Sequence, residues 1–467
     1  MNTFDPASDA TLESPHVFLT RNRFDLGIKL FFLAHIERDF ALTAYQNDIL
    51  TLTHGRFSEP DHSEKATFDD YLSVFHGLVK TFELGDPSLI PPVHLANDGT
   101  LLNGAHRVAA ALHSGSSLYA VRTKNPPLPL TQGFYTKYGL SHSDQMLYLL
   151  GLLKFLKSPK VVVIWPKGHA FKDDIRSNLG PPMAEFSFPV SSHSLQYVVQ
   201  TLYEEESWTS RGLSSVSITE KARQVFEAGK PITFYVLEST SEELFQTKKR
   251  HLRARFGLGY SSFHSTDTRE EVKRLLEFLA CEDLHIVFGL SESEGRSAIR
   301  TAKRTRSICR SASIDVNEVA VDGSSILDLY QIRPARDLDL VSLHPQNAEG
   351  FRTEDELREL ALDPAEILLD PRKYCVLHGV KFLTLSQVSR GKQARGEKKD
   401  VADLGLIDEY RRPFRKHRPI TLRSRSRGYL VSGGFRSVLW LAGKFRRVGL
   451  GRYVDRVNEF ISRCQGR

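Results

Sequence analysis

Apolar residues recur along this chain at two different spacings. Over residues 23–52 and again over 68–82 they return every three or four positions, which predicts amphipathic helices. Residues 160–165 (KVVVIW) form instead a continuous apolar run with β-branched side chains, which is typical of a strand buried on both faces. We expect three further strands at residues 184–190, 232–237 and 284–288.

Helical patterns separate these strands, at residues 195–206, 241–255 and 269–281. Strands that alternate with helices indicate an α/β layer whose sheet is at least partly parallel. A chain of 467 residues is too long for a single core, so several domains are expected. We therefore place a central α/β domain at 126–295, between an N-terminal module at 1–125 and a third module at 296–410.

Residues 93–115 carry the first candidate site. Asn97, Asp98 and Gly99 predict a tight turn between two short strands, and a helix follows. Arg107 falls in the first turn of that helix, where a basic side chain opposes the helix dipole. An anion bound at this place would account for it. The plainer interpretation, a structural histidine–arginine pair at a helix start, stays open.

This element resembles the ParB/sulfiredoxin fold, in which a strand and an Asp-Gly turn are followed by a Gly-x-His-Arg type sequence that opens a helix. The resemblance covers about residues 65–125. It implies that the element binds the phosphates of a nucleotide. Carried over by position, it implicates Asn103, Gly104, His106 and Arg107.

Residues 321–341 (VDGSSILDLYQIRPARDLDLV) carry the second candidate site. Gly323 and Ser324 stand at the start of a predicted helix, where backbone N–H groups suit a phosphate. Asp337 and Asp339 are two apart, so on a strand they project from one face. Two carboxylates held that close repel each other unless a cation such as Mg²⁺ lies between them.

The alternation also predicts that Leu338 and Leu340 face the core. The stretch resembles the nucleotidyltransferase superfamily of DNA polymerase β type, whose signature is a hydrophobic residue, Gly-Ser or Gly-Gly, a short helix, and Asp-x-Asp on the next strand. The plainer interpretation is an ordinary helix-to-strand unit whose aspartates are solvated.

A second match to this superfamily follows in the expected order. A strand ending in a Gly-x-x-hydrophobic run leads into a helix with basic residues and then aspartates. The matching positions are Lys392, Arg395, Lys399, Asp400 and Asp403.

The resemblance implies a magnesium-dependent transferase that uses a nucleoside triphosphate and spans about residues 310–410. Asp337 and Asp339 would be catalytic and would hold the metal. Members usually carry a third carboxylate on a later strand, and Glu366, beside a predicted strand at 366–369, is the candidate catalytic residue for that role. The expected nucleotide-binding residues of this module are Gly323, Ser324, Arg336 and Lys392.

Charge is distributed unevenly. Residues 411–447 hold twelve Lys or Arg and no Asp or Glu, whereas the whole chain carries only +7, so the body is mildly acidic. We predict a basic amphipathic helical tail over 411–467, with Trp440 on its apolar side. Such a tail suits an anionic membrane surface. Docking on the acidic body and contact with RNA are the alternatives.

The four cysteines lie far apart without a CxxC pair, and the N-terminus is polar, without the apolar segment of a signal peptide. We therefore expect a reduced, cytoplasmic protein, with the tail allowing a peripheral place on the inner membrane face.

The sequence thus predicts an α/β and α+β multidomain protein. The main functional hypothesis is a nucleotidyl or phosphoryl transferase whose acceptor is unknown, with a surface-glycan or lipid-linked precursor as one option. The competing hypothesis is a ParB-like regulatory protein that binds a nucleotide or nucleic acid and carries a degenerate nucleotidyltransferase domain.

Overall fold

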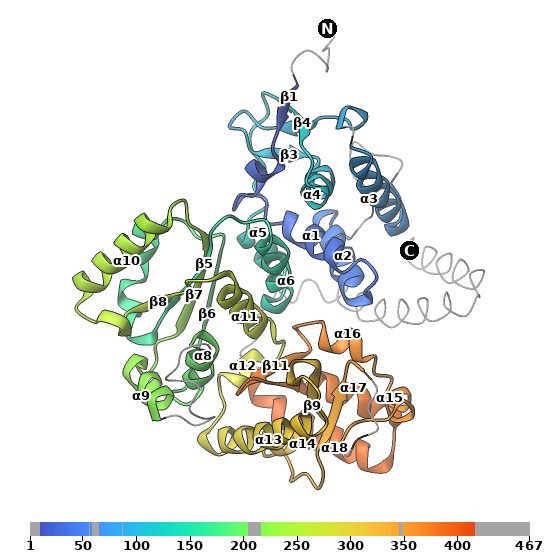
Figure 1. Cartoon of the computed structure of the whole chain (residues 1–467), viewed down its shortest axis with the longest axis vertical. Coiled ribbons are helices and arrows are strands. Elements are labelled where there is room, and N and C mark those ends of the chain that lie inside the picture. Colours follow the sequence, from blue (N-terminus) through green and yellow to red (C-terminus); the bar gives the residue numbers. More distant parts are fainter. Residues whose placement is uncertain are drawn as a thin grey trace. The chain divides into compact units, whose positions relative to one another are not determined.

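The computed structural model describes residues 10–55, 57, 65–85, 87–203, 216–344, 348 and 350–415. These residues form a mixed α/β protein with three four-stranded sheets, whose elements are labelled in Figure 1. Each sheet is built from one continuous part of the chain: residues 11–122, 159–265 and 319–383.

The first sheet has the strand order β1-β4-β2-β3. Its strands are β1 (Thr11–Glu13), β2 (Val93–Leu95), β3 (Leu101–Asn103) and β4 (Leu118–Arg122). β2 and β3 form the predicted antiparallel hairpin, and Gly99 takes a φ of +87° in its turn. α4 (Ala105–Ser114) follows β3, and β2 pairs with β4 in parallel.

The helices expected in the N-terminal part are present. They are α1 (Leu26–Ala34), α2 (Asp39–Leu52) and α3 (Phe68–Glu83), and α3 begins with a capping box formed by Thr67 and Asp70. α6 (His142–Leu153) packs closely on α1 because the two helices meet at glycines. A Cβ on Gly27 or Gly151 would collide with the backbone of the facing helix. α6 also packs against α11 (Arg269–Ala280), so it joins the N-terminal helices to the central sheet.

A buried charge network lies under these helices. Lys29 Nζ is 2.8 Å from Asp48 Oδ2 and 3.4 Å from Asp25 Oδ2. Arg23 pairs with Asp25, and the hydroxyls of Tyr135 and Tyr148 both donate to Asp48 Oδ1. Buried charges persist only when paired and hydrogen-bonded, and this network meets both conditions within the core.

The second sheet has the order β6-β7-β5-β8. Its strands are β5 (Pro159–Ile164), β6 (Ala184–Phe188), β7 (Ile232–Glu238) and β8 (Phe263–Ser265). Every neighbouring pair is antiparallel, so the prediction of a partly parallel sheet is wrong. β5 and β6 do run in the same direction, but β7 lies between them. The helices therefore connect strands that are not parallel neighbours.

Two of the helices between these strands were predicted, α8 (Leu195–Leu202) and α10 (Glu242–Phe256). Two more, α7 (Lys172–Leu179) and α9 (Val216–Val225), were not. The expected strand at 284–288 is instead the helix α12 (Leu284–Val287). A five-residue run with four apolar residues suits a buried helical turn as well as a buried strand, so the run alone does not distinguish them.

The third sheet has the order β10-β9-β12-β11. Its strands are β9 (Val319–Asp322), β10 (Asp339–Ser342), β11 (Tyr374–Leu377) and β12 (Val380–Leu383). β9 pairs with β10 antiparallel and with β12 in parallel, and β11–β12 is a hairpin. The surrounding helices are α13 (Glu292–Ser311), α14 (Ser324–Leu329), α15 (Glu354–Glu359), α16 (Pro364–Leu368), α17 (Leu385–Arg395) and α18 (Lys398–Arg415).

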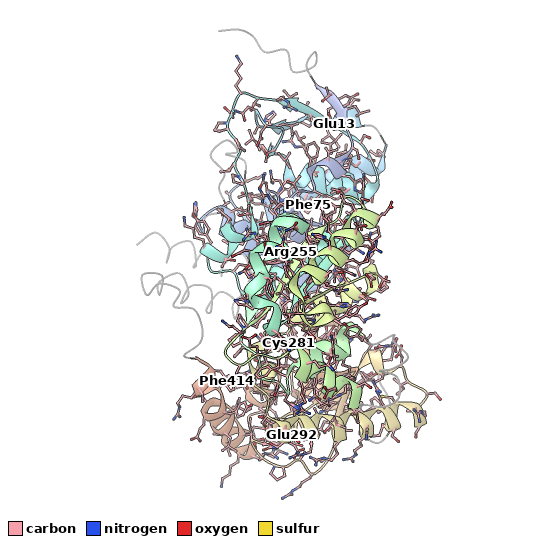
Figure 2. All side chains as sticks on the ribbon, turned by 90° about the vertical axis from the view of Figure 1, so that its left-hand side faces the viewer. Glu13, Phe75, Arg255, Cys281, Glu292 and Phe414 are labelled. Carbon is pink, nitrogen blue, oxygen red and sulfur yellow. A yellow bond between two sulfur atoms is a disulfide. The ribbon has the colours of Figure 1, made fainter. Side chains whose placement is uncertain are left out.

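The expectation of a fully reduced chain is contradicted, because Cys281 and Cys375 form a disulfide. Cys281, labelled in Figure 2, directly follows α11 as its C-cap, and Cys375 lies in β11. The two residues are 94 positions apart, so sequence spacing gave no signal of the pair. The bond ties the helix beside the second sheet to an edge strand of the third.

Almost all of the described residues belong to one compact unit, Met1–Phe414. Arg411, the first residue of the predicted tail, still belongs to α18, and its Nη2 is 3.4 Å from Asp283 Oδ1. The predicted tail helix with Trp440 lies outside the described residues. In the part of the chain that is described, no helix is both long and apolar enough to cross a membrane.

Candidate functional site

The second candidate site forms where β9 ends. Asp322 is the last residue of β9, and Gly323 then turns the chain into α14. The chain returns in β10, whose first residue, Asp339, lies opposite Asp322 in the antiparallel register. Leu338 and Leu340 are buried, as the alternation predicts. Two aspartates thus meet across a strand pair, and only one of them was expected.

Gly323 is required at this turn for two reasons. Its φ of +63° is one that L side chains rarely adopt. A Cβ there would also collide with Asp339 Oδ2 and lie 2.8 Å from Arg352 Nη2. Any larger residue here would displace Asp339 or Arg352.

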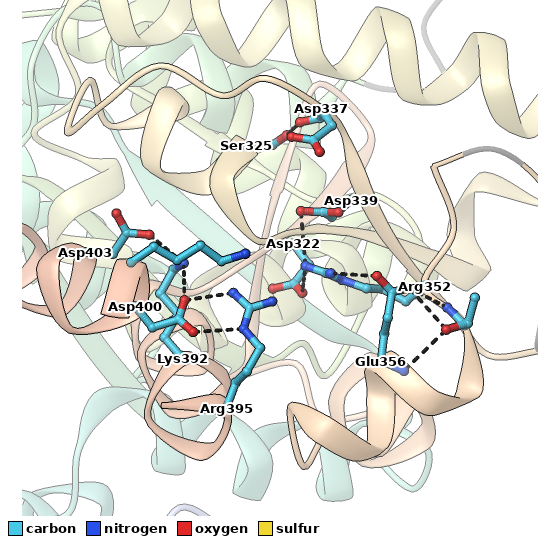
Figure 3. Close-up of polar contacts among 12 residues, drawn as sticks. Asp322, Ser325, Asp337, Asp339, Arg352, Glu356, Lys392, Arg395, Asp400 and Asp403 are labelled. Atoms are coloured by element: carbon cyan, nitrogen blue, oxygen red, sulfur yellow. Dashed lines mark hydrogen bonds and ion pairs between the residues drawn. The ribbon is translucent and has the colours of Figure 1, made fainter. Parts of the chain in front are cut away.

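Arg352 lies between the two aspartates (Figure 3). Its side chain is only 8% exposed, and Nη2 is 3.3 Å from Asp322 Oδ2 and 3.1 Å from Asp339 Oδ2. Nη1 is 3.4 Å from Glu356 Oε1 on α15. The backbone fixes this placement, because Phe351 bridges Leu340 of β10 and Arg352 N–H donates to the Leu340 carbonyl at 2.9 Å.

The charge balance of the site favours an additional cation. Burial raises the pKa of Asp339, and the negative charges of Asp322, Asp337 and Glu356 raise it further, while Arg352 alone among the major influences lowers it. A pKa raised in this way means that the ionised carboxylate is under-compensated.

Asp337 lies just before β10 rather than within it. It is exposed, and its backbone carbonyl accepts a hydrogen bond from Ser325 Oγ at 3.0 Å (Figure 3). The predicted pair therefore sits at one end of β10, with Asp339 partly buried and Asp337 open to solvent. Arg336 is exposed next to Asp337, and Ser324 is half-buried at the start of α14.

The prediction for Glu366 is wrong. Residues 364–368 form α16 and not a strand, because Asp363 caps the helix and Pro364 occupies its first turn. Both Glu366 carboxylate oxygens accept backbone hydrogen bonds, from Asp39 N at 3.0 Å and Phe40 N at 2.9 Å. The side chain therefore caps α2.

The carboxylate that accompanies Asp337 and Asp339 is Asp322 instead. Its signal in the sequence is its place directly before Gly323, at the end of an apolar strand. Arg352 gave no comparable signal.

Lys392 is paired with two aspartates. It is buried, and its Nζ lies 3.1 Å from Asp400 Oδ1 and 2.6 Å from Asp403 Oδ2 (Figure 3). Arg395 binds Asp400 with two nitrogens, each at 2.8 Å, and Arg333 binds Asp403 at 2.6 Å. The pairs of Lys392 and Arg395 join α17 to α18, and the pair of Arg333 joins α18 to the loop that follows α14.

Oxygen donors are what Mg²⁺ requires, and Asp322, Asp337 and Asp339 supply them. In the described residues no three His, Cys, Asp or Glu side chains are already gathered as a metal-ligand set. The guanidinium of Arg352 compensates Asp322 and Asp339 in this arrangement. The carboxylate oxygens are therefore of the type that binds magnesium. In this structure Arg352 balances the charge of two of these carboxylates.

In the first candidate site, Arg107 Nη1 donates to the carbonyls of Pro91 and Pro92, at 2.8 and 2.5 Å. Burial lowers the pKa of Arg107. His106 Nε2 is 2.7 Å from the Tyr45 hydroxyl, and burial, with nearby Lys29, holds its pKa well below the usual range. The neutral ring packs edge-on against Phe75, 4.9 Å between centroids.

The remaining two predicted residues of this element lie at its turn. Asn103 ends β3 opposite His94, and Gly104 has a φ of +107°, where a Cβ would press on Val93. The structure thus brings Asn103, Gly104, His106 and Arg107 together at the start of α4, with the last two engaged in contacts of the protein itself.

No family model, no curated protein and no solved structure matches this chain.

Proposed function

We propose that the third module is a magnesium-dependent nucleotidyl or phosphoryl transferase that uses a nucleoside triphosphate. The observation that carries the proposal is the contact of Asp339 with Gly323, opposite Asp322 at the end of β9. A carboxylate cluster held against a glycine turn, with Asp337 open to solvent beside it, supplies the oxygen ligands that a magnesium ion needs, and this supports the proposal.

In this proposal Asp337 and Asp339 hold the magnesium ion. The ion would neutralise charge on the phosphates during transfer. Gly323 lets Asp339 and Arg352 lie directly against the turn, and Arg336, exposed beside the pair, would contact a phosphate from solvent. Arg352 orients Asp322 and Asp339 through its paired nitrogens.

Lys392 has a different role from the one expected of it. Because Asp400 and Asp403 pair with its ammonium group, we expect it to stabilise the α17–α18 pair and not to contact the nucleotide. The acceptor stays a prediction, since the tail that suggested a lipid-linked or surface-glycan precursor lies outside the described residues.

The test is release of pyrophosphate or phosphate from nucleoside triphosphates by the full chain, with and without Mg²⁺. Asp337→Asn and Asp339→Asn are expected to abolish the Mg²⁺-dependent release. Asp355→Asn is the matched control, because Asp355 is 86% exposed on α15 and pairs only with Arg358 among the described contacts. Full activity in the Asp337/Asp339 double variant would remove the proposal.

One observation favours a second candidate, a domain that binds a nucleotide without transferring it. Arg352 already compensates Asp322 and Asp339, so the carboxylates have a counter-charge without any metal. This candidate corresponds to a regulatory protein with a degenerate transferase domain. It predicts nucleotide binding that does not depend on Mg²⁺, together with no turnover of any nucleoside triphosphate.

A further inference from the structure

A cavity of 120 Å³ lies between the helices beside the second sheet and the edge of the third. α8 contributes Tyr197, α11 contributes Glu277, and the β11–β12 hairpin contributes Tyr374, His378 and Lys381. A polar cavity needs only about 10–15 Å³ to hold one water molecule. This space is therefore large enough for a small solute.

His378 stands in the wall of the cavity with an unsatisfied side chain. The residue is 5% exposed, and neither Nδ1 nor Nε2 has a hydrogen-bond partner within the described residues. A neutral imidazole has one donor and one acceptor, and buried polar groups are nearly always paired. Its backbone carbonyl is held by Arg306 at 2.7 Å, and Tyr197 packs edge-on at 5.5 Å, so the ring is held in place.

The hairpin turn gives a second, independent indication. His378 and Gly379 form the two-residue connection between Leu377 and Val380, with φ of +53° and +65°. Turns with two positive φ values favour Asn-Gly, which avoids most of the backbone strain. The chain thus places a histidine where asparagine folds better, and buries it unpaired. A residue type that the backbone conformation disfavours, and that gains no compensating contact in the fold, is expected mainly at functional sites.

The charges around the ring are mainly positive. Burial, together with the nearby His193, Arg306 and Lys303, lowers the pKa of His378 to about 4. Lys381 lies in the same wall, 4.8 Å above the Tyr374 ring, and its Nζ donates to the carbonyls of Asn317 and Leu368.

Glu277 supplies the opposing charge in the cavity wall. Burial raises its pKa, although Lys273 and Lys381 act to lower it. The lining thus holds two cationic side chains, Arg274 and Lys381, against the single carboxyl group of Glu277.

We propose that this cavity binds a small oxyanion, a phosphate or carboxylate group, through a ring N–H of His378 and the charge of Lys381. The site is separate from the residues assigned to the transferase. The anion accounts for the unpaired imidazole, for the histidine in an Asn-Gly type turn, and for the excess of positive charge.

Two variants test the proposal. His378→Asn keeps the turn and is expected to leave the unliganded thermal midpoint unchanged or higher, because Asn-Gly suits the hairpin better. Glu277→Gln removes the opposing carboxylate and is expected to strengthen anion binding several-fold. The probes are inorganic phosphate and acetate, titrated separately into the full chain at constant ionic strength, so that the two sources of an oxyanion are distinguished.

The readout is the Cε1 resonance of His378 in histidine-labelled protein, assigned by its loss in His378→Asn. One of the two probes should shift this resonance with saturation in wild-type protein, and calorimetry should show at least tenfold weaker binding of that probe to His378→Asn. If neither probe moves the resonance, the cavity holds water only and the proposal fails. It fails equally if His378→Asn lowers the unliganded midpoint while binding is unchanged, because the ring is then structural.

Discussion

Replacing Arg352 by methionine removes the only cation paired with Asp322 and Asp339 among the described contacts, while keeping a side chain of similar length. The side chains of Arg352 and Asp322 are 8% and 5% exposed, and that of Asp339 is 26% exposed. Removing one partner of a buried ion pair costs about 3–5 kcal/mol. Since Asp339 is partly exposed, we expect the lower end, ~3 kcal/mol, which is roughly a hundredfold in an opening equilibrium.

Amide hydrogen exchange of peptides covering residues 319–342 measures this opening directly, because it reports on the strands that hold the ion pair. Arg358→Met is the matched control. Arg358 is 73% exposed and pairs with Glu354 and Asp355 on the same helix. Exposed pairs are worth about 0–1 kcal/mol, so its effect on exchange should be less than about tenfold.

Mg²⁺ extends the prediction to the proposed site. In Arg352→Met the two carboxylates lose their counter-charge, so adding Mg²⁺ should slow exchange in β9 and β10 again, and should do little in Arg358→Met. Two results would refute the reasoning. One is an equal effect of both variants. The other is exchange in Arg352→Met that Mg²⁺ does not slow, which would show that these carboxylates do not hold a divalent cation.

Three further predictions follow from single contacts. Gly323→Ala should destabilise the β9–α14 turn by about 1–3 kcal/mol and displace Asp339, seen as faster exchange in β10; unchanged exchange would contradict the strained turn. The Cys281–Cys375 bond joins residues 94 positions apart, so reducing it should remove about 4 kcal/mol of stability and lower the thermal midpoint. Mass spectrometry of the non-reduced protein must first show the bonded pair, and an unchanged midpoint after reduction would contradict the prediction. Burial lowers the pKa of His142 to about 4, so below about pH 6.5 the unfolded chain binds a proton that the fold does not. The free energy of unfolding should therefore fall as the pH drops from about 6.5 to 4, by at most about 3 kcal/mol. A His142→Gln variant with an unchanged acid midpoint would contradict this.

Local patterns in the sequence predicted local structure well. The helices at 23–52 and 68–82, the hairpin around Gly99, and the burial of Leu338 and Leu340 all follow from periodicity and turn chemistry that neighbouring residues determine. The predicted helix with Lys392 is present too. Its lysine differs from expectation because two aspartates one helix later occupy it.

The failures concern partners that sequence spacing does not encode. Strand direction in the second sheet depends on which strands become neighbours, and β7 comes to lie between β5 and β6. Glu366 caps a helix more than three hundred residues away in the chain. Asp322 and Arg352 meet Asp339 only because β9, β10 and the bridge at Phe351 align them. Residues that meet through such strand pairings can be identified only once the order and register of the strands are known.

The most direct test of the proposed transferase is phosphorus NMR of the products formed from each nucleoside triphosphate by the full chain, with Mg²⁺ and a pool of small-molecule acceptors. The proposal predicts conversion that EDTA stops and that Asp337→Asn with Asp339→Asn abolishes. Pyrophosphate with a modified α-phosphorus would identify nucleotidyl transfer, whereas a nucleoside diphosphate with a modified γ-phosphorus would identify phosphoryl transfer. Unchanged triphosphate signals for all four nucleotides, or equal conversion by the double variant, would contradict the account.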